Sequence, residues 1–260
     1  MKTLSFLLQL WKTNLLSAME YRAAFITQIL GMILNNTIYF LIWVIFFERF
    51  KEIRGWGLSD MFLVFGVAAA AFGLGVFLFG NALMLSDLIA QGKLDYYLSL
   101  PRPVLLHAIA SRSVTSGLGD MLYGLLSYCA SGLFSPSGLL RFLLGVLLAA
   151  AVFVSFMVLA QSLAFWFGNA SAFTSLLVNA MITFAIYPVT LFEGGAKFIL
   201  FTIIPAALMG AVPASFVRAF DGHTLALLAL GASVLLVFSV AVFYRGLRRY
   251  ESGSAIQNQV

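Results

Sequence analysis

The sequence predicts an all-α polytopic membrane protein with six transmembrane helices, an N-terminal interfacial amphipathic helix and a re-entrant broken-helix segment before the last span. Composition is the first observation behind this fold class. Hydrophobic residues make up 62% of the chain and charged residues only 10%, whereas soluble domains contain about 25% charged residues. The second observation is that apolar runs, at a mean hydropathy of +1.01, extend over nearly all 260 residues. A water-soluble fold cannot bury that much apolar surface, so we expect a single membrane domain.

Residues 1–22 precede any candidate span, and we expect them to form a cytoplasmic helix that lies in the membrane interface. Their apolar side chains fall on one helical face, while most of the polar ones lie elsewhere. The apolar set is Leu4, Leu7, Leu8, Trp11, Leu15 and Met19. A plain extension of the first span is the alternative interpretation.

Charge-free windows locate the spans, because a charge at mid-bilayer costs about 2.5–3.5 kcal/mol and about 20 apolar residues cross the hydrocarbon core. Residues 142–192 contain no Asp, Glu, Lys or Arg, and a turn at Gly168–Ser171 divides them into two spans. The six expected spans are residues 23–47, 61–86, 113–133, 142–167, 172–192 and 224–244. The transmembrane domain therefore covers residues 23–244, and a cytoplasmic tail, 245–260, follows it.

Residues 198–217 are long enough to cross a membrane but contain Pro205, Gly210 and Pro213. Broken helices occur at membrane depth where they pack against protein or line a cavity. We expect a re-entrant or interfacial pair of half-helices here, and a seventh span is the alternative.

The distribution of basic residues predicts a multi-pass protein of the inner or plasma membrane with both termini in the cytoplasm. With six spans, more of the 15 Lys and Arg residues lie on the side of the termini than on the opposite side. Arg245, Arg248 and Arg249 directly follow the last span. The lipid bilayer explains the net charge of +5, so we expect no nucleic-acid partner. The single cysteine, Cys129, excludes an intrachain disulfide and a cysteine-based metal site, and we expect no metal.

The longest cytoplasmic connection, residues 87–112, has the most distinctive sequence. It contains the pattern Gly-x-Leu-Asp-x-x-Leu-x-x-Pro, formed by Gly92, Leu94, Asp95, Leu98 and Pro101. We expect a short amphipathic helix that ends at Pro101 and Pro103, because proline cannot continue a helix. The apolar and aromatic side chains expected to be exposed, and so to need a partner surface, are Leu94, Tyr96, Tyr97 and Leu98.

This motif resembles the signature of one branch of the ABC-2-type permeases, the membrane subunits of ATP-binding cassette exporters. The chain length, the N-terminal helix, the six spans and the broken segment agree with that layout. The resemblance implies that residues 87–112 form a coupling loop whose short helix docks on a cytosolic ATPase subunit. The residues implied at this contact are Gly92, Lys93, Leu94, Asp95, Tyr96, Leu98 and Pro101. It also implies a second permease, either an identical copy or a homologous chain.

The chain contains no Gly-x-x-x-x-Gly-Lys-Ser/Thr phosphate loop, and Gly92-Lys93 lacks both the upstream glycine and the following hydroxyl residue. We therefore expect ATP and Mg on the partner ATPase and no cofactor in this chain. No paired acids or nucleophile–base motif suggests catalysis, so we expect a non-catalytic membrane subunit.

Four polar residues are candidates for a role in transport. Asp120 is the one carboxylate well inside a span, and intramembrane acids are functional candidates by default. It could serve as a proton site or a substrate contact, or it could bond a neighbouring helix. Glu193, Lys197 and Arg218 flank the broken segment as a candidate outer gate, although residues that merely bound apolar segments at the interface are the alternative.

Two functions remain open: the exporter subunit, with an unidentified substrate, and an ion-coupled secondary transporter or channel that works without an ATPase. The second would depend on Asp120. Gly66 and Ala70, and Ala71 and Gly75, stand in small-xxx-small spacing, which suits either close packing within the chain or a seam between two permeases.

Overall fold

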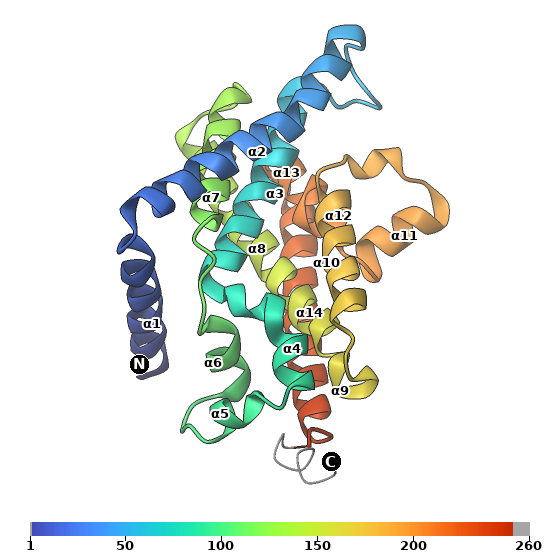
Figure 1. Cartoon of the computed structure of the whole chain (residues 1–260). Helices are drawn as coiled ribbons and strands as arrows, with labels where there is room; N and C mark the ends of the chain where they lie inside the picture. The colour runs from blue at the N-terminus through green and yellow to red at the C-terminus, as the bar shows by residue number, and fades with distance from the viewer. Residues whose placement is uncertain (1, 252–260) are drawn as a thin grey trace.

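The computed structural model describes residues 2–251, and the regular elements in that part of the chain are helical (Figure 1). This confirms the predicted all-α class. Of the tail predicted at 245–260, residues 252–260 lie outside the described residues.

The elements are α1 (Lys2–Met19), α2 (Arg22–Arg49), α3 (Leu58–Phe79), η1 (Gly80–Met84), α4 (Leu85–Ala90), α5 (Leu94–Leu98), α6 (Val104–Ala110), α7 (Gly117–Ala130), α8 (Pro136–Gln161), α9 (Ala164–Phe167), α10 (Ser171–Ala185), η2 (Val189–Leu191), α11 (Gly194–Thr202), α12 (Ala206–Met209), α13 (Ala211–Arg218) and α14 (Gly222–Leu247). Here η1 and η2 are short 3₁₀ helices.

Four helical stretches within residues 2–251 are long and apolar enough to cross a membrane. They are Arg22–Arg49, Leu58–Ala90, Pro136–Phe167 and Gly222–Leu247. These stretches contain the first, second, fourth and sixth predicted spans. The bent pair formed by α11 with α12–α13 would make a fifth if it were a single span. The chain is therefore a multi-pass membrane protein.

The third and fifth predicted spans form shorter helices than the sequence suggests. α7 has 14 residues and α10 has 15, which correspond to about 21–23 Å of helical rise against a hydrocarbon core of about 30 Å. α7 begins late because Val114 N donates to Val76 O (3.0 Å) and Asn81 N donates to Arg112 O (3.1 Å), which holds the preceding residues against the end of α3. α10 ends before Pro188, which restricts the residue that precedes it. The total of six spans stays a prediction.

The fourth span begins earlier than the charge-free window suggested. Ser135 caps α8 by accepting a hydrogen bond from Gly138 N (3.0 Å), and Pro136 occupies the first turn. Arg141 therefore lies inside the helix rather than before it. Gly168, with φ of +66°, separates α9 from the next helix at the predicted turn.

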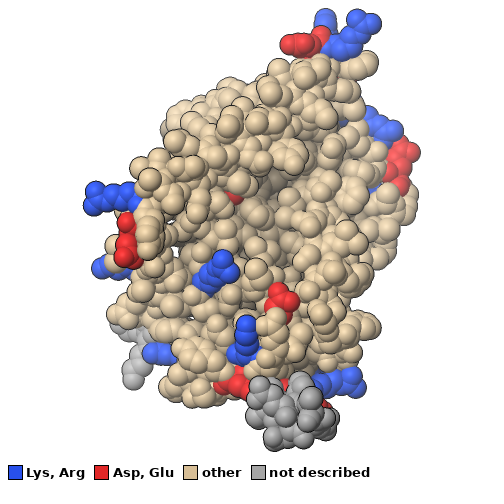
Figure 2. All heavy atoms as spheres, in the orientation of Figure 1, with Lys and Arg blue, Asp and Glu red and all other residues tan. Residues whose placement is uncertain are grey.

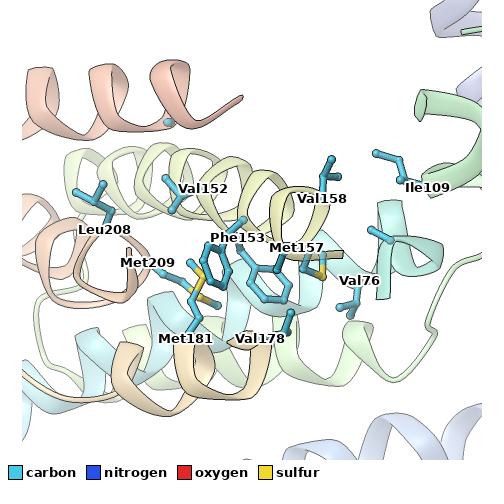
Figure 3. Packing of buried hydrophobic residues seen from close by; sticks show 14 of the residues in the cluster. Val76, Ile109, Val152, Phe153, Met157, Val158, Val178, Met181, Leu208 and Met209 are labelled. Atoms are coloured by element: carbon cyan, nitrogen blue, oxygen red, sulfur yellow. The ribbon is translucent and has the colours of Figure 1, made fainter. Parts of the chain in front are cut away.

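α8 lies at the centre of the bundle and packs against α3, α13 and α14. Phe153 and Met157 of this helix are fully buried, and Figure 3 shows them beside Val178 and Met181 of α10 and Met209 of α12. By contrast, only 17% of the most apolar window is buried in α2 and in α14, against 61–67% in the two central spans. We infer that α2 and α14 face lipid or a partner chain.

α3 and α7 approach closely through pairs of glycines. A Cβ added at Gly124 would lie 2.5 Å from Gly66 O, and one at Gly117 would lie 2.6 Å from Gly73 O. Real Cβ atoms do not approach other atoms this closely. The small residues of the second span therefore serve packing within this chain.

The broken segment before α14 consists of α11, α12 and α13, with a bend of 60° between α11 and the two helices that follow. Both ends of the segment meet the same loop. Glu193 pairs with Arg54 (2.6 Å), while Arg218 pairs with Asp60 (3.3 Å) and donates to Gly55 O (3.4 Å). Because a single crossing would place its two ends on opposite sides, this geometry favours the re-entrant interpretation.

α1 contacts α2 and α6 and lies at one side of the bundle (Figure 1). Its predicted apolar face is divided: Leu7 is buried and Trp11 partly buried against the protein, whereas Leu4, Leu8 and Met19 are exposed. An interfacial position for this helix stays a prediction. Figure 2 shows charged side chains at the two ends of the molecule, at both side edges and on the lower half of the visible face, with few on its upper half.

Candidate functional site

The connection predicted as a coupling loop, residues 87–112, folds at one end of the bundle as α4, α5 and α6 (Figure 1). Gly92, with φ of +70°, turns the chain between α4 and α5 in a backbone conformation that favours glycine. Lys93 N donates to Leu88 O (2.9 Å), which satisfies a carbonyl at the end of α4. The five-residue α5 then ends ahead of Pro101, as expected from the prolines.

α5 has one buried side and one exposed side. Leu94 is fully buried and Tyr97 is 9% exposed, whereas Tyr96 is 64% and Leu98 is 44% exposed. The expectation that all four side chains need a partner surface is therefore wrong for Leu94 and Tyr97, because they pack into the core of this chain.

Hydrogen bonds fix the buried side of α5 to the neighbouring helices. The Tyr97 hydroxyl lies 2.9 Å from Ser111 Oγ. Asn81 Nδ2 donates to Ser111 Oγ (2.9 Å) and to Ala108 O (2.7 Å). Since Asn81 belongs to η1 at the end of α3, this network connects α5 and α6 to the second span.

Asp95 of α5 lies beside Tyr250, which follows α14. Burial and the neighbouring Asp95 raise the pKa of Tyr250 to about 12. The ring of Tyr250 packs edge-on against Phe165, which in turn contacts Phe243 of α14 (centroids 6.3 and 5.4 Å apart). α5 is thus placed between the cytoplasmic ends expected for the second and last spans.

α1 contacts the same region from its other side. The Phe6 ring meets the His107 ring edge-on (5.0 Å), and the Arg102 guanidinium lies over Phe6 (4.7 Å). Trp11 Nε1 donates to Leu78 O (2.7 Å) at the end of α3. Burial, and secondly the charge of Arg102, lower the pKa of His107.

The exposed residues of the predicted contact are Lys93, Tyr96, Leu98 and Pro101, and we call them the α5 surface. Of the other residues in the predicted set, Gly92 and Asp95 are partly buried and Leu94 is fully buried. The α5 surface therefore combines one cation with an aromatic, an aliphatic and a proline side chain on a rigid, internally bonded support.

Asp120 is 1% exposed and bonds a neighbouring helix. Asn36 Nδ2 of α2 donates to Asp120 Oδ1 (2.6 Å) and also to Met32 O (3.0 Å). Asp120 Oδ2 is buried without a hydrogen-bond partner among the described residues. Sequence reasoning missed Asn36, because the search for spans counted charges and ignored amides within an uncharged window.

The candidate outer gate is brought together only in part. Glu193 pairs with Arg54 of the loop between α2 and α3, and Arg218 pairs with Asp60 at the start of α3; both of these partners were missed in the sequence. Lys197 is exposed on α11. Glu193 and Arg54 are 76% and 50% exposed, so their pairing is a surface salt bridge, a class that contributes about 0–1 kcal/mol. Within residues 2–251, no group of three His, Cys, Asp or Glu residues could hold a metal ion.

Comparison with known families identifies a match over most of the chain. The model of the ABC-2 family transporter protein matches residues 33–254, which include the α5 surface, Asp120 and the broken segment. No curated protein matches the chain.

Proposed function

The chain belongs to the ABC-2 transporter family, and we propose that it is the permease subunit of an exporter driven by ATP hydrolysis on a separate ATPase chain. The family and the apolar helices make it a multi-pass membrane transport component. The lack of a phosphate loop supports a separate ATPase as the site of ATP and Mg.

The α5 surface is the observation that carries this proposal. Exposed Tyr96 and Leu98 project from a helix whose opposite side is buried and hydrogen-bonded. Aromatic side chains are enriched at protein interfaces and often contribute most to binding. We assign the ATPase contact to this surface.

Transmission follows from the support beneath the α5 surface. A force applied at Tyr96 and Leu98 is transmitted to α3, because the adjacent Tyr97 is hydrogen-bonded through Ser111 to Asn81 at the end of that helix. Tyr250, beside Asp95 of α5, packs against Phe165, which in turn contacts Phe243 of α14. Closure of the ATPase subunits would thus tilt α3 and α14 as rigid bodies, which is a recognised route of conformational coupling.

This function places the α5 end of the molecule, and both termini, on the cytoplasmic side of the inner or plasma membrane. The three arginines after α14 agree with that orientation. A second permease, identical or homologous, would complete the transport path. The large exposed apolar surface of α2 could contact this second permease. The substrate, which is unidentified, would be held between the two chains.

Copurification tests the proposal. The chain is co-expressed with the ATPase encoded beside it, and the double variant Tyr96→Asp/Leu98→Asp is compared with wild type. We expect the variant to retain at least about tenfold less ATPase, since loss of central interface residues commonly costs more than 1.4 kcal/mol. Phe134→Asp is the matched control, because Phe134 is 61% exposed and follows α7, well away from α5. Retention of ATPase by the double variant, with stimulated hydrolysis intact, would exclude docking at this surface.

The alternative, an ion-coupled carrier, is favoured by the unpartnered Oδ2 of Asp120. It predicts ion movement without an ATPase. In vesicles that contain the chain alone and a pH-sensitive dye, we expect no proton flux. Proton flux that Asp120→Asn abolishes would favour the carrier over the exporter subunit.

A further inference from the structure

A cavity of about 350 Å³ lies between α3, α6, α8 and α14, and its lining does not include Asp120 or the α5 surface. The lining is aliphatic and aromatic apart from two serines and one tyrosine hydroxyl. Ile109 and Val158 form part of its buried floor and lie near each other in Figure 3. Its volume falls in the range of about 300–1,000 Å³ typical of small-molecule sites.

The cavity opens at the side of the helical bundle. Its rim residues Leu147, Leu236 and Tyr244 are 58%, 49% and 39% exposed, while the floor is less than 10% exposed. α8 and α14, which carry this rim, are two of the stretches long enough to cross a membrane. An apolar opening between two such helices is accessible from the bilayer, so a lipid can enter it directly.

One polar atom in the cavity wall points to a ligand. Ser155 is 1% exposed, and its Oγ has no hydrogen-bond partner among the described residues. Buried hydroxyls in native proteins are normally hydrogen-bonded. The other serine of the lining, Ser239, already donates to Leu236 O (3.0 Å). Ser155 is therefore free to bond an oxygen of the occupant.

The charge at the mouth indicates which kind of lipid fits. Leu236, Val240 and Tyr244 line the cavity at successive i, i+4 positions of α14, and the same stripe reaches the exposed Arg248 one turn later. Arg245 and Arg249 flank it, and Glu251 is the one acid in residues 245–251. An apolar stripe that ends in an exposed arginine matches an acyl chain that ends in an anionic headgroup.

We propose that this cavity binds one acyl chain of an anionic phospholipid, with the phosphate at Arg248 and the hydroxyl of Ser155 bonded to a lipid oxygen. The site lies beside α6 and next to the end of α14, the elements that support the α5 surface. A bound lipid therefore fills the space between α6, α8 and α14. The proposal is independent of the ATPase contact.

Photolabelling tests the site. A phosphatidylglycerol probe with a diazirine in its acyl chain is added to vesicles of phosphatidylcholine that contain the full chain, and labelled peptides are mapped after irradiation. We expect label on residues 147–158 of α8, with unlabelled phosphatidylglycerol competing more strongly than phosphatidylcholine. Label confined to the outward surfaces of α2 and α14 would overturn the proposal.

Two substitutions in the cavity wall sharpen the result, and the first has a matched control. Ala151→Phe fills the cavity, and we expect it to lower labelling of α8 about tenfold, which corresponds to 1.4 kcal/mol. Val237→Phe is the control, because Val237 is 69% exposed and lies outside the lining. Should Ala151→Phe fail to fold, Ser155→Ala removes only the hydroxyl and is expected to weaken labelling about fivefold, the effect of one hydrogen bond.

The headgroup contact has its own variant. Arg248→Gln is expected to reduce the preference for phosphatidylglycerol about fivefold, as one basic residue near the membrane surface contributes about that much. Arg249→Gln removes a cation that lies off the stripe of cavity residues and should reduce the preference less, and equal loss in both would overturn the contact at Arg248. A second copy of the chain is the competing occupant. Efficient disulfide formation between chains carrying Leu236→Cys and Cys129→Ser, without lipid label on α8, would place that copy over the cavity instead.

Discussion

At the residue scale, Asp120 depends on a single partner. Its Oδ1 accepts a hydrogen bond from Asn36, and no other donor among the described residues reaches the carboxyl group. The pair connects α2, which is otherwise little buried, to α7. The polar contact thus contributes to holding the first span against the bundle.

Asn36→Leu should therefore destabilise the folded chain. It leaves a buried carboxyl group without its donor, which costs about 1–3 kcal/mol. Asp120→Asn should have a smaller effect, because two amides can still bond. The unfolding temperature in detergent, followed by tryptophan fluorescence, measures both. Thr37→Val is the control, since Thr37 is exposed on the same helix and bonds only Ile33 O. An Asn36→Leu variant as stable as wild type would show that the hydrogen bond between Asn36 and Asp120 does not stabilise the fold.

His107 gives the contact between α1 and α6 a dependence on pH. Its pKa in the folded chain lies below the ordinary value of 6.5, because of burial and then Arg102. The unfolded chain therefore binds more protons than the folded chain just below pH 6.5. The folded chain therefore has its full free energy of unfolding above pH 6.5, and this free energy falls as the pH drops toward the lowered pKa.

We expect His107→Gln to reduce this loss of stability between pH 7 and pH 5, measured as the change in unfolding temperature with pH. His223→Gln is the matched control, because His223 is the other of the two histidines and is exposed on α14. If the two variants show the same pH dependence as wild type, protonation of His107 does not affect folding.

The two sides of α5 show what a residue pattern can predict about burial and what it cannot. Leu94 and Tyr97 are three residues apart and share a helical face, so the sequence could have paired them. Which face is buried depends on Asn81 and Ser111, which come from other elements. That choice could not be predicted from a five-residue segment.

At the scale of elements, the charge-free windows found the long helices because a buried charge is costly, but they misplaced several ends. The start of α8 had a local signal in Ser135 and Pro136 that a capping search would have found. The short α7 had none. Its start is set by backbone hydrogen bonds between Val114 and Val76, which are distant in sequence.

The contact between α3 and α7 can be tested directly. Gly73→Leu should force the helices apart, because even a Cβ there would meet Gly117 O and lie 2.8 Å from Asp120 Cβ. We expect loss of the monodisperse folded species on size-exclusion chromatography, in line with the several kcal/mol of severe overpacking. Gly31→Leu is the control, since no atom lies within 4 Å of a Cβ at that position on α2. Normal behaviour of Gly73→Leu would show that these helices separate freely.

At the scale of the whole molecule, the loop of residues 50–57 and the start of α3 hold both ends of the broken segment. Arg54 bonds Glu193 and the Thr190 carbonyl, while Gly55 O and Asp60 meet Arg218. The sequence predicted the break from its prolines and glycine. It could not predict that the ends return to one place, because the partners lie more than a hundred residues away in the chain.

Accessibility to a membrane-impermeant maleimide distinguishes a re-entrant segment from a seventh span. Single cysteines in a Cys129→Ser background are placed at Gly195, Phe220 and Tyr96, all of them exposed. We expect Gly195→Cys and Phe220→Cys to react in intact cells, and Tyr96→Cys to react only after permeabilisation. A crossing at 194–218 would instead leave one of the first two unreactive in intact cells. Since the ion pairs of Glu193 and Arg218 join both ends to the loop of residues 50–57 and the start of α3, labelling from opposite sides would require these contacts to break.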